Sequence, residues 1–518
     1  MNIFRSIDEN AGKDNKIANK IQGGGACCTN NIVQKCLLFA VGLFLIFGAA
    51  GGKTAQAAVE IVGEPPAGCK LNAIVHNYTI VSRWTDEGKL DQTFYSKMER
   101  EYENGYTTED TALEIETAAQ FMTFRKFINE GNSFAGKFVC LTNNIDFGGR
   151  GLKITYDDQG NGTQNINLTG DVENCLEYDF LANSDKYFSG TFDGCMYSIS
   201  NFIYLGNDPS LFSECSNATI KNVIVNSDSA FIDASYMSQK VAGIVSIAYN
   251  STIENCCNAA FIGDNNYASA GICGYAGQNT IIKNCCNLGN IFGAPSAGIA
   301  YSYYSDEKSI SNCYSIGQVN GFWGDFGPSC FLSENFGGGQ NGFPELTNLY
   351  YNSTVPGMGS AVSVYDGNAF NAVDDNNFTN VKGLTTEQMQ GEAAKTNMVG
   401  FADATYNGKP VWLFEEGQYP KLNTAIANRK KRLKSSDFVC THPKDMFYDG
   451  KGKTITIAPK PGITGIGAVT IKYYKVNSDG TLGDASTTLP TDAGRYKVKF
   501  DVASGTEYYS AKDLPAMF

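Results

Sequence analysis

Three stretches in the middle of the chain repeat one another. Residues 251–258 read STIENCCN, residues 279–287 read NTIIKNCCN, and residues 308–315 read KSISNCYS. The asparagines of this motif, Asn255, Asn284 and Asn312, are 29 and 28 residues apart. A second series, Ala-Gly-Ile, recurs in phase at 242–244, 270–272 and 297–299. Two interleaved series with one period predict a repeat architecture in which each unit stacks on the next.

The repeat unit has the chemistry of short strands joined by sharp corners. Apolar and polar residues alternate in the motif, so isoleucine and cysteine can share one face. Glycine and asparagine tolerate the left-handed backbone that a corner needs. One unit cannot bury its apolar face alone, but units stacked about 4.8 Å apart can. The sequence therefore predicts an all-β fold, a right-handed parallel β-helix over residues 115–425. Degenerate copies at 197–203, 218–225 and 345–351 extend the series.

The alignment stacks two residue types at one corner. We expect Asn255, Asn284 and Asn312 to form a ladder of side-chain amides, although ordinary turn formation is the alternative. The next residues, Cys256, Cys285 and Cys313, are expected to form a buried ladder of free thiols, because a free cysteine behaves as a small apolar residue. Disulfides are the alternative, since an exported chain with 16 cysteines can form them. The residues after these, Cys257, Cys286 and Tyr314, should then point outward.

Composition excludes several classes of function. The chain has 518 residues, which is longer than a single compact core grows. Its 40 basic and 53 acidic residues give a net charge of −13, which argues against nucleic acid or an anionic membrane as a partner. The two histidines, His76 and His442, cannot form the HExxH zinc motif and leave little for histidine-dependent catalysis. We predict no catalytic, metal-binding or cofactor-binding residue.

The N-terminus has the pattern of an export signal. Residues 37–47 read LLFAVGLFLIF, an apolar run that is short for a membrane-spanning helix. Lys16, Lys20 and Lys35 precede the run, and Ala55-Gln56-Ala57 follows it. This pattern predicts a signal peptide with a long n-region over residues 1–57, and an uncleaved N-terminal anchor is the alternative. We therefore expect a secreted or cell-surface protein with no membrane span in the mature chain.

Other segments flank the repeats. After an N-terminal extension over 58–114, residues 117–131 predict an amphipathic helix that caps the first unit. Its Phe121, Phe124 and Ile128 share one face, and Gly131 is its C-cap. The run RKKRLK at 429–434 lies in a predicted basic linker, 426–440. Alternating residues at 454–457, 469–474 and 496–502 predict a small β-sandwich over 441–518.

Two parts of the chain resemble known families. Residues 134–147 (FAGKFVCLTNNIDF), 188–194 (FSGTFDG), the two repeat series, 383–389 and 412–422 together resemble GLUG-type repeat proteins. That family includes adhesin-like bacterial surface proteins and some immunoglobulin-A peptidases. The segments 447–451 (FYDGK), 490–496 (PTDAGRY) and 505–509 (GTEYY) resemble immunoglobulin-like modules of bacterial surface proteins. An insertion at 150–187 departs from the first pattern.

These observations favour a non-catalytic binding or adhesion function. The expected partner is a host or cell-surface glycan or protein. Exposed aromatic residues could contact it, and the candidates are Tyr301, Tyr303, Tyr304, Tyr350 and Tyr351. Packing of these tyrosines inside the repeats is the alternative. A carbohydrate-active β-helix enzyme, either a polysaccharide lyase or a hydrolase, is the alternative function, and it would need carboxylates clustered on adjacent units.

Overall fold

The computed structural model of the chain describes residues 57–517, with gaps at 64–69, 85, 87, 179–185, 207–208, 234–239, 264–267, 294–295, 303–308, 322–328, 335–344, 356–359, 366–369, 373–377, 427–429 and 445–448. Of the signal predicted over 1–57, only Ala57 lies within these ranges. The predicted contact residues Tyr303 and Tyr304 lie outside them. Within these ranges, no helix combines the length and the apolar character that a membrane crossing requires.

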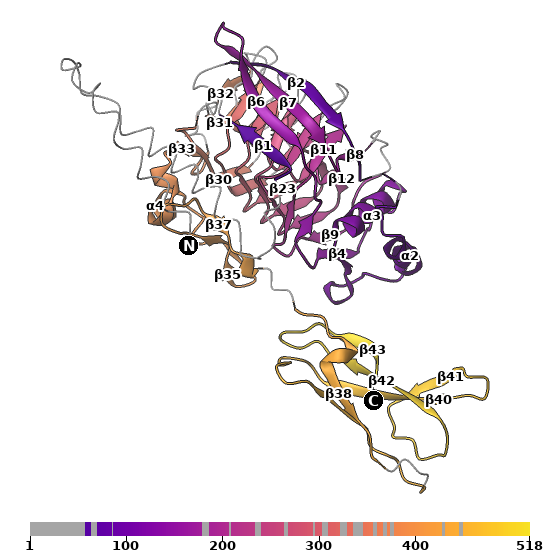
Figure 1. Cartoon of the computed structure of the whole chain (residues 1–518). Helices are drawn as coiled ribbons and strands as arrows, with labels where there is room; N and C mark the ends of the chain where they lie inside the picture. The colour runs from indigo at the N-terminus through magenta and orange to yellow at the C-terminus, as the bar shows by residue number, and fades with distance from the viewer. Residues whose placement is uncertain are drawn as a thin grey trace, which may run out of the picture. The chain divides into compact units, whose positions relative to one another are not determined.

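The repeats build parallel sheets, each of which gains strands as the chain advances (Figure 1). The largest contains β3 (Leu113–Ile115), β4 (Phe138–Leu141), β9 (Thr191–Asp193), β13 (Thr219–Lys221), β18 (Thr252–Glu254), β23 (Ile281–Lys283), β27 (Ser309–Ser315), β30 (Glu345–Asn352) and β33 (Lys382–Leu384). Its second row joins at β27 and comprises β5 (Ile145–Asp146), β10 (Ser198–Ser200), β14 (Ile224–Val225), β19 (Cys257–Asn258) and β24 (Cys286–Asn287).

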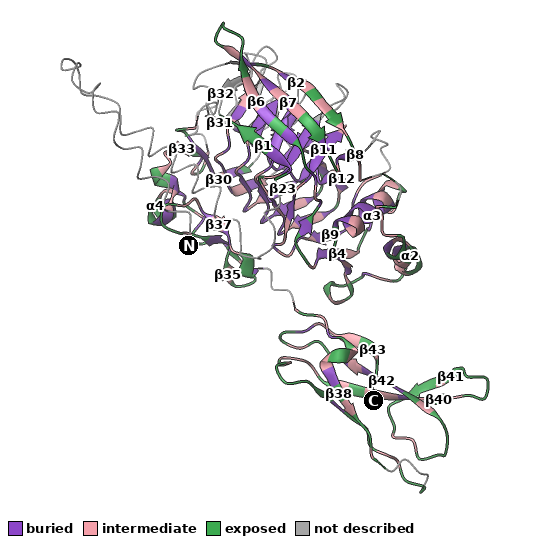
Figure 2. Cartoon of the chain, viewed as in Figure 1, coloured by how far each residue is buried: buried purple, intermediate pink, exposed green. Residues whose placement is uncertain are grey.

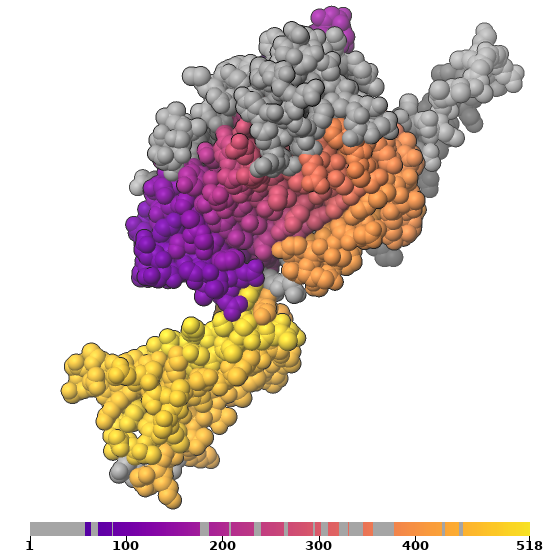
Figure 3. Space-filling view, turned by 180° about the vertical axis from the view of Figure 1, so that it is seen from behind, coloured from indigo at the N-terminus to yellow at the C-terminus, as the bar shows by residue number. Residues whose placement is uncertain are grey.

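Two further sheets complete each repeat. One contains β8 (Leu176–Tyr178), β11 (Ile203–Gly206), β15 (Ala230–Asp233), β20 (Phe261–Gly263), β25 (Ile291–Gly293) and β28 (Val319–Gly321). The other contains β12 (Phe212–Ser216), β17 (Val245–Tyr249), β22 (Cys273–Ala276), β26 (Ser296–Ser302), β29 (Ser329–Glu334), β31 (Ser360–Tyr365) and the antiparallel β32 (Phe370–Ala372), with β16 (Lys240–Ala242) and β21 (Ala268–Ala270) alongside. Figure 3 shows successive segments as neighbouring bands of colour. The mostly-β prediction is confirmed at this level.

The isoleucines of the repeat motif hold the register. Ile220 pairs with Ile253, Ile253 with Ile282, and Ile282 with Ile310, and all four side chains are buried. Burial of such a side chain contributes roughly 1.5–3 kcal/mol. A slip by one residue would turn this whole row to the opposite face, so the register is strongly specified. Figure 2 shows burial concentrated on the strands of the repeats.

The predicted helix is α3 (Ala118–Asn129), which begins after the N-cap Thr117 and ends at Glu130. Gly131, with φ of +99°, lies one residue past that cap rather than at it. Phe121 packs edge-on against Phe147 and Phe192, so the helix contributes to the core of the first strands. Tyr95 of a second helix, α2 (Gln92–Glu101), and its C-cap residue Tyr102 pack on Phe127 of α3.

The N-terminal extension and the insertion at 150–187 form one sheet together. Its strand order is β1 (Val59–Val62), β6 (Leu152–Asp158), β7 (Thr163–Val172), β2 (Lys70–Ile80). The pairing of β2 with β7 is parallel and that of β6 with β7 is antiparallel. Residues of this sheet share a core with Leu205, Ile232, Phe261 and Phe292 of β11, β15, β20 and β25. The sheet therefore covers an outer face of the repeats.

A closing segment, defined here as residues 378–426, covers a second outer face. It contains β33, η3 (Glu387–Met389), α4 (Gly391–Asn397), β34 (Thr405–Tyr406), β35 (Lys409–Pro410), β36 (Trp412–Leu413), β37 (Lys421–Leu422) and η4 (Thr424–Ile426). Cys257, Cys286 and Tyr314 lie in one buried cluster with Trp412 and Phe401 of this segment. They turn away from the interior, as expected, but they face a packed protein layer instead of solvent.

The C-terminal module is built from two antiparallel sheets. One pairs β38 (Phe438–Thr441) with β39 (Thr456–Pro459), and the other has the order β41 (Leu482–Ser486), β40 (Val469–Val476), β42 (Tyr496–Val502), β43 (Ala511–Pro515). Phe438 and Phe500 from the two sheets are in contact at 4.9 Å between ring centroids. Leu433 lies in the same core, and the backbone of Lys431 forms an isolated parallel β-bridge with Tyr508. Part of the segment predicted as a linker, which includes η5 (Ser435–Asp437), thus belongs to this module.

Candidate functional site

The corner asparagines form one continuous ladder of side chains. Each amide Nδ2 donates to the Oδ1 of the preceding asparagine at 2.8–3.3 Å, in the order Asn380, Asn348, Asn312, Asn284, Asn255, Asn222. Asn222 then donates to Asp193 Oδ1 at 2.9 Å. All six asparagines have φ between 52° and 58°. The three residues predicted to stack therefore lie inside a longer chain of amides that ends on a carboxylate.

A second polar ladder was not expected from the sequence. Asn258, the last residue of the first motif, is fully buried and donates to Asn287 Oδ1 at 2.9 Å. Asn287 donates in turn to Ser315 Oγ at 3.3 Å. A Cβ atom on Gly271 would lie 2.5 Å from Asn287 Cγ, so the glycine of the Ala-Gly-Ile series makes room for this ladder. The sequence signal that could have predicted this contact is the nearly constant spacing between the Ala-Gly-Ile series and the asparagine motif.

The aligned cysteines lie in the interior as free thiols. Cys256, Cys285 and Cys313 are all fully buried and unbridged. The backbone N–H of Cys285 donates to Cys313 Sγ at 3.4 Å. Burial raises the pKa of Cys256 and Cys285 well above the ordinary range of a thiol. Since the thiolate is the reactive form, these side chains are inert structural groups.

Thiol counting distinguishes this arrangement from disulfides. None of the twelve cysteines in the described ranges is in a disulfide, and only Cys195 and Cys440 among them are partly exposed. We expect a thiol-specific reagent to modify these two in the folded protein and about ten more after denaturation without reductant. An unchanged count on denaturation would show that the cysteines are bridged.

The tyrosines proposed as exposed ligand contacts are not exposed. Tyr301 and Tyr350 have 1% and 0% of their surface accessible, and Tyr351 has 8%. The Tyr350 hydroxyl donates to the carbonyl of Val399 in the closing segment. Tyr301 lies beside Lys240, whose Nζ is 5.6 Å from the ring centroid. The prediction of exposure is wrong for these three residues: the closing segment covers Tyr350, Tyr351 belongs to the interior core of the repeats, and Tyr301 is buried.

The face of β9, β13, β18 and β23 presents two outward rows. One row contains Thr191, Thr219, Thr252 and Ile281, in register across the four strands. The other row alternates in charge, with Asp193, Lys221, Glu254 and Lys283 in register. Neighbouring members form ion pairs, of 3.5 Å for Lys221–Asp193 and 2.9 Å for Lys283–Glu254. The row is therefore neutral as a whole.

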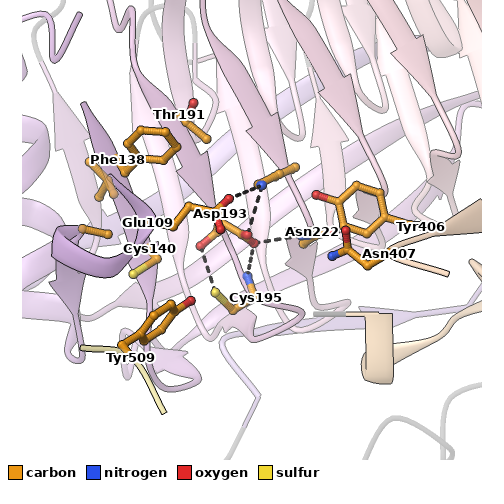
Figure 4. A pocket seen from close by; sticks show the side chains of 13 residues that line it. Glu109, Phe138, Cys140, Thr191, Asp193, Cys195, Asn222, Tyr406, Asn407 and Tyr509 are labelled. Atoms are coloured by element: carbon orange, nitrogen blue, oxygen red, sulfur yellow. Dashed lines mark hydrogen bonds and ion pairs between the residues drawn. The ribbon is translucent and has the colours of Figure 1, made fainter. Parts of the chain in front are cut away.

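A cavity of about 100 Å³ lies at the beginning of this face (Figure 4). Tyr406 and Asn407, from the β34–β35 hairpin, line one side, and Phe138 and Glu109 line the other. Thr191, Asp193 and Lys221 line it from the strands. Pockets for whole small-molecule ligands are about 300–1,000 Å³. The cavity is therefore large enough only for the end group of a ligand.

The charged groups that line the cavity interact with one another. Burial alone would lower the pKa of Lys221, but Asp193, Tyr406 and Glu109 together raise it above its ordinary value. Lys221 Nζ lies 3.4 Å from Glu109 Oε1. Asp193 Oδ1 accepts from Asn222 and from the backbone N–H of Cys195 at 2.8 Å. A permanently protonated lysine donates hydrogen bonds but does not act as a nucleophile or base. This arrangement suits recognition of polar groups.

Within the described ranges, no group of three or more His, Cys, Asp or Glu side chains could hold a metal ion. No family model matches the chain, and no curated protein matches it. The chain is similar to a solved structure from Bacteroides ovatus that is provisionally described as an immunoglobulin A1 protease. The identity is 16%, the TM-score is 0.35, and the match covers 62% of this chain and 95% of the other.

Proposed function

We propose that residues 115–425 form a right-handed parallel β-helix and that the chain is a non-catalytic binding protein of the secreted or cell-surface class. Its partner is a glycan or protein of a host or a cell surface. The observation that carries this proposal is the Lys221 cavity, in which Lys221 contacts the carboxylates of Asp193 and Glu109 and whose walls combine aromatic, amide and hydroxyl groups. Such walls fit a polar, uncharged end group.

The proposed binding face lies on β9, β13, β18 and β23, outside the two faces of the repeats that other parts of the chain cover. The sheet of β1, β6, β7 and β2 covers one outer face of the repeats, and the closing segment covers another. The rows beginning at Thr191 and Asp193 keep partial exposure along β9, β13 and β23. A partner that inserts its end group beside Lys221 could continue along these rows. The hydroxyl and charged groups of the two rows, which recur at intervals of about 4.8 Å, would then form hydrogen bonds with the partner.

The test uses the mature chain, residues 58–518, on an array of glycans and host proteins. We expect Lys221→Gln to weaken binding of the retained ligand at least tenfold, because the cavity loses its central ammonium group, whose charge-assisted hydrogen bonds are stronger than those of an amide. Lys421→Gln is the matched control, since Lys421 pairs with Glu415 in the closing segment and neither lines the cavity nor belongs to the two rows. Binding that is unaffected by Lys221→Gln would contradict the proposed site. No ligand on the array, or turnover of a glycan, would contradict the proposed function.

A further inference from the structure

A second group of side chains with the character of a ligand site lies one corner away from the cavity. Tyr249, the last residue of β17, has 37% of its surface exposed, although it follows four half-buried or buried residues. Three positions later, Thr252 begins β18 in the hydroxyl row. The exposed ring therefore adjoins the face to which the cavity belongs.

The ring of Tyr249 is held in a fixed position. A Cβ atom on Gly277 would lie 2.3 Å from Tyr249 Cδ1 and 2.6 Å from Cε1, so the ring rests directly on this glycine. Tyr275 meets the ring edge-on, at 5.6 Å between centroids and 69° between planes. Such edge-to-face pairs are favourable by about 0.5–1.5 kcal/mol beyond area burial. The repeat thus supports an aromatic surface whose orientation is fixed before any ligand arrives.

A carboxylate lies beside this surface. Glu214 of β12 is in register with Ile247, which is in register with Tyr275 on the next strand. Burial raises the pKa of Glu214, and burial followed by the charge of Glu214 raises the pKa of Tyr249. Among the residues that the structure describes, no cation forms an ion pair with Glu214. The carboxylate is thus a hydrogen-bond acceptor without a charged partner in this part of the chain.

We propose that Tyr249, Tyr275 and Glu214 bind a neutral glycan, an inference that rests on the proposed binding function and names its ligand class. The C–H face of a sugar ring would lie on Tyr249, and a sugar hydroxyl would donate to Glu214. A neutral sugar can make both interactions, because it has an apolar ring face for stacking and hydroxyl groups that donate hydrogen bonds. An anionic glycan would place a second negative charge beside Glu214, which is unfavourable. The site therefore selects against uronic-acid polymers.

The experiment titrates the mature chain with cellohexaose and chitohexaose as neutral probes and with a galacturonic-acid hexamer as the anionic probe. We expect at least one neutral probe to bind, and the anionic probe to bind at least tenfold more weakly. Tyr249→Ala should lower the neutral affinity at least tenfold, whereas Tyr249→Phe keeps the ring and should stay within about threefold. Gly277→Ala should also weaken binding because it displaces the ring without removing it. Tyr474→Ala is the matched control, a tyrosine whose hydroxyl donates to Asp513 in the C-terminal module.

The outcomes separate this inference from the function on which it rests. Neutral probes that do not bind, or that bind Tyr249→Ala as well as the parent chain, overturn the glycan site. The binding function still stands in that case if the array yields a ligand that Lys221→Gln loses. An unchanged thermal midpoint for Tyr249→Ala and Gly277→Ala shows that a loss of affinity is local. If both variants lower that midpoint, Tyr249→Phe and Glu214→Gln decide: retention by the first and weakening by the second support the site, and any other pattern overturns it.

Discussion

Replacement of Asn284 by alanine is expected to lower the free energy of unfolding of the repeats by about 3–8 kcal/mol. Asn284 donates to Asn255 Oδ1 at 3.2 Å and accepts from Asn312 Nδ2 at 3.3 Å. Alanine would leave both partners without their ladder bond, and each buried unpaired group costs about 1–3 kcal/mol. It would also hold a φ of 54°, which costs a residue with a Cβ roughly 1–2 kcal/mol. Denaturant unfolding followed by circular dichroism measures the sum.

Two further variants separate these contributions. Asn284→Gly removes the ladder bonds but relieves the backbone, so it should cost less than Asn284→Ala by about 1 kcal/mol. Asn279→Ala is the matched control because Asn279 has a φ of 51° and donates to Asn250 Oδ1 at an exposed corner. We expect the control to cost about 1–2 kcal/mol. Equal costs at 279 and 284 would show that the buried ladder adds no net stability.

The corner ladder could be predicted from the sequence because its signal is local and periodic. Asn255, Asn284 and Asn312 recur with nearly constant spacing, and asparagine is favoured in the left-handed region. The first repeat was harder to align, since the motif around Asn201 resembles the later copies. In the structure, Asn201 donates to Asp146 beside β10, whereas the residue that ends the long ladder is Asp193. The position that corresponds to Asn222 in that repeat is Gly194, one residue after Asp193, so the asparagine signal is missing there.

The covered faces could not be predicted from the repeat pattern. Outward positions such as Cys286 and Tyr314 look alike whether they meet solvent or another part of the chain. Trp412 packs 5.6 Å from Tyr314, and these residues are almost one hundred positions apart. The same holds for the extension, where β2 pairs with β7 across a similar distance. Alternation within a strand identifies two faces, but it cannot say which distant segment covers either of them.

The cavity combines local and distant information. Asp193 and Lys221 come from neighbouring repeats, so their pairing follows from the register. Tyr406 comes from the closing segment, and Glu109 precedes the first strand of the large sheet. Nothing in the spacing of these residues shows that they meet. The Tyr249 surface is different, because Gly277 takes the place of Tyr249 in the next repeat and Tyr275 lies two positions before that glycine.

Replacement of Gly271 by alanine should be among the most destabilising single changes in the repeats, about 3 kcal/mol or more. The added Cβ would lie 2.2 Å from the carbonyl oxygen of Gly298 and 2.5 Å from Asn287 Cγ. Gly298 belongs to the next repeat, so relief of the contact would require two stacked repeats to separate. Asn287 cannot move away without loss of its bonds to Asn258 and Ser315. The clash therefore breaks both a backbone contact and a buried polar ladder.

Gly160→Ala is the control for this change. Gly160 lies between β6 and β7 with a φ of 75°, and an added Cβ would meet nothing within 4 Å. Alanine there carries the backbone strain without the clash, so we expect a cost of about 1–2 kcal/mol. Gly271 has no such strain, and its cost would come from lack of space alone. Comparable unfolding midpoints for the two variants would contradict this packing argument, since the close approach of successive repeats at Gly243, Gly271 and Gly298 is what it requires.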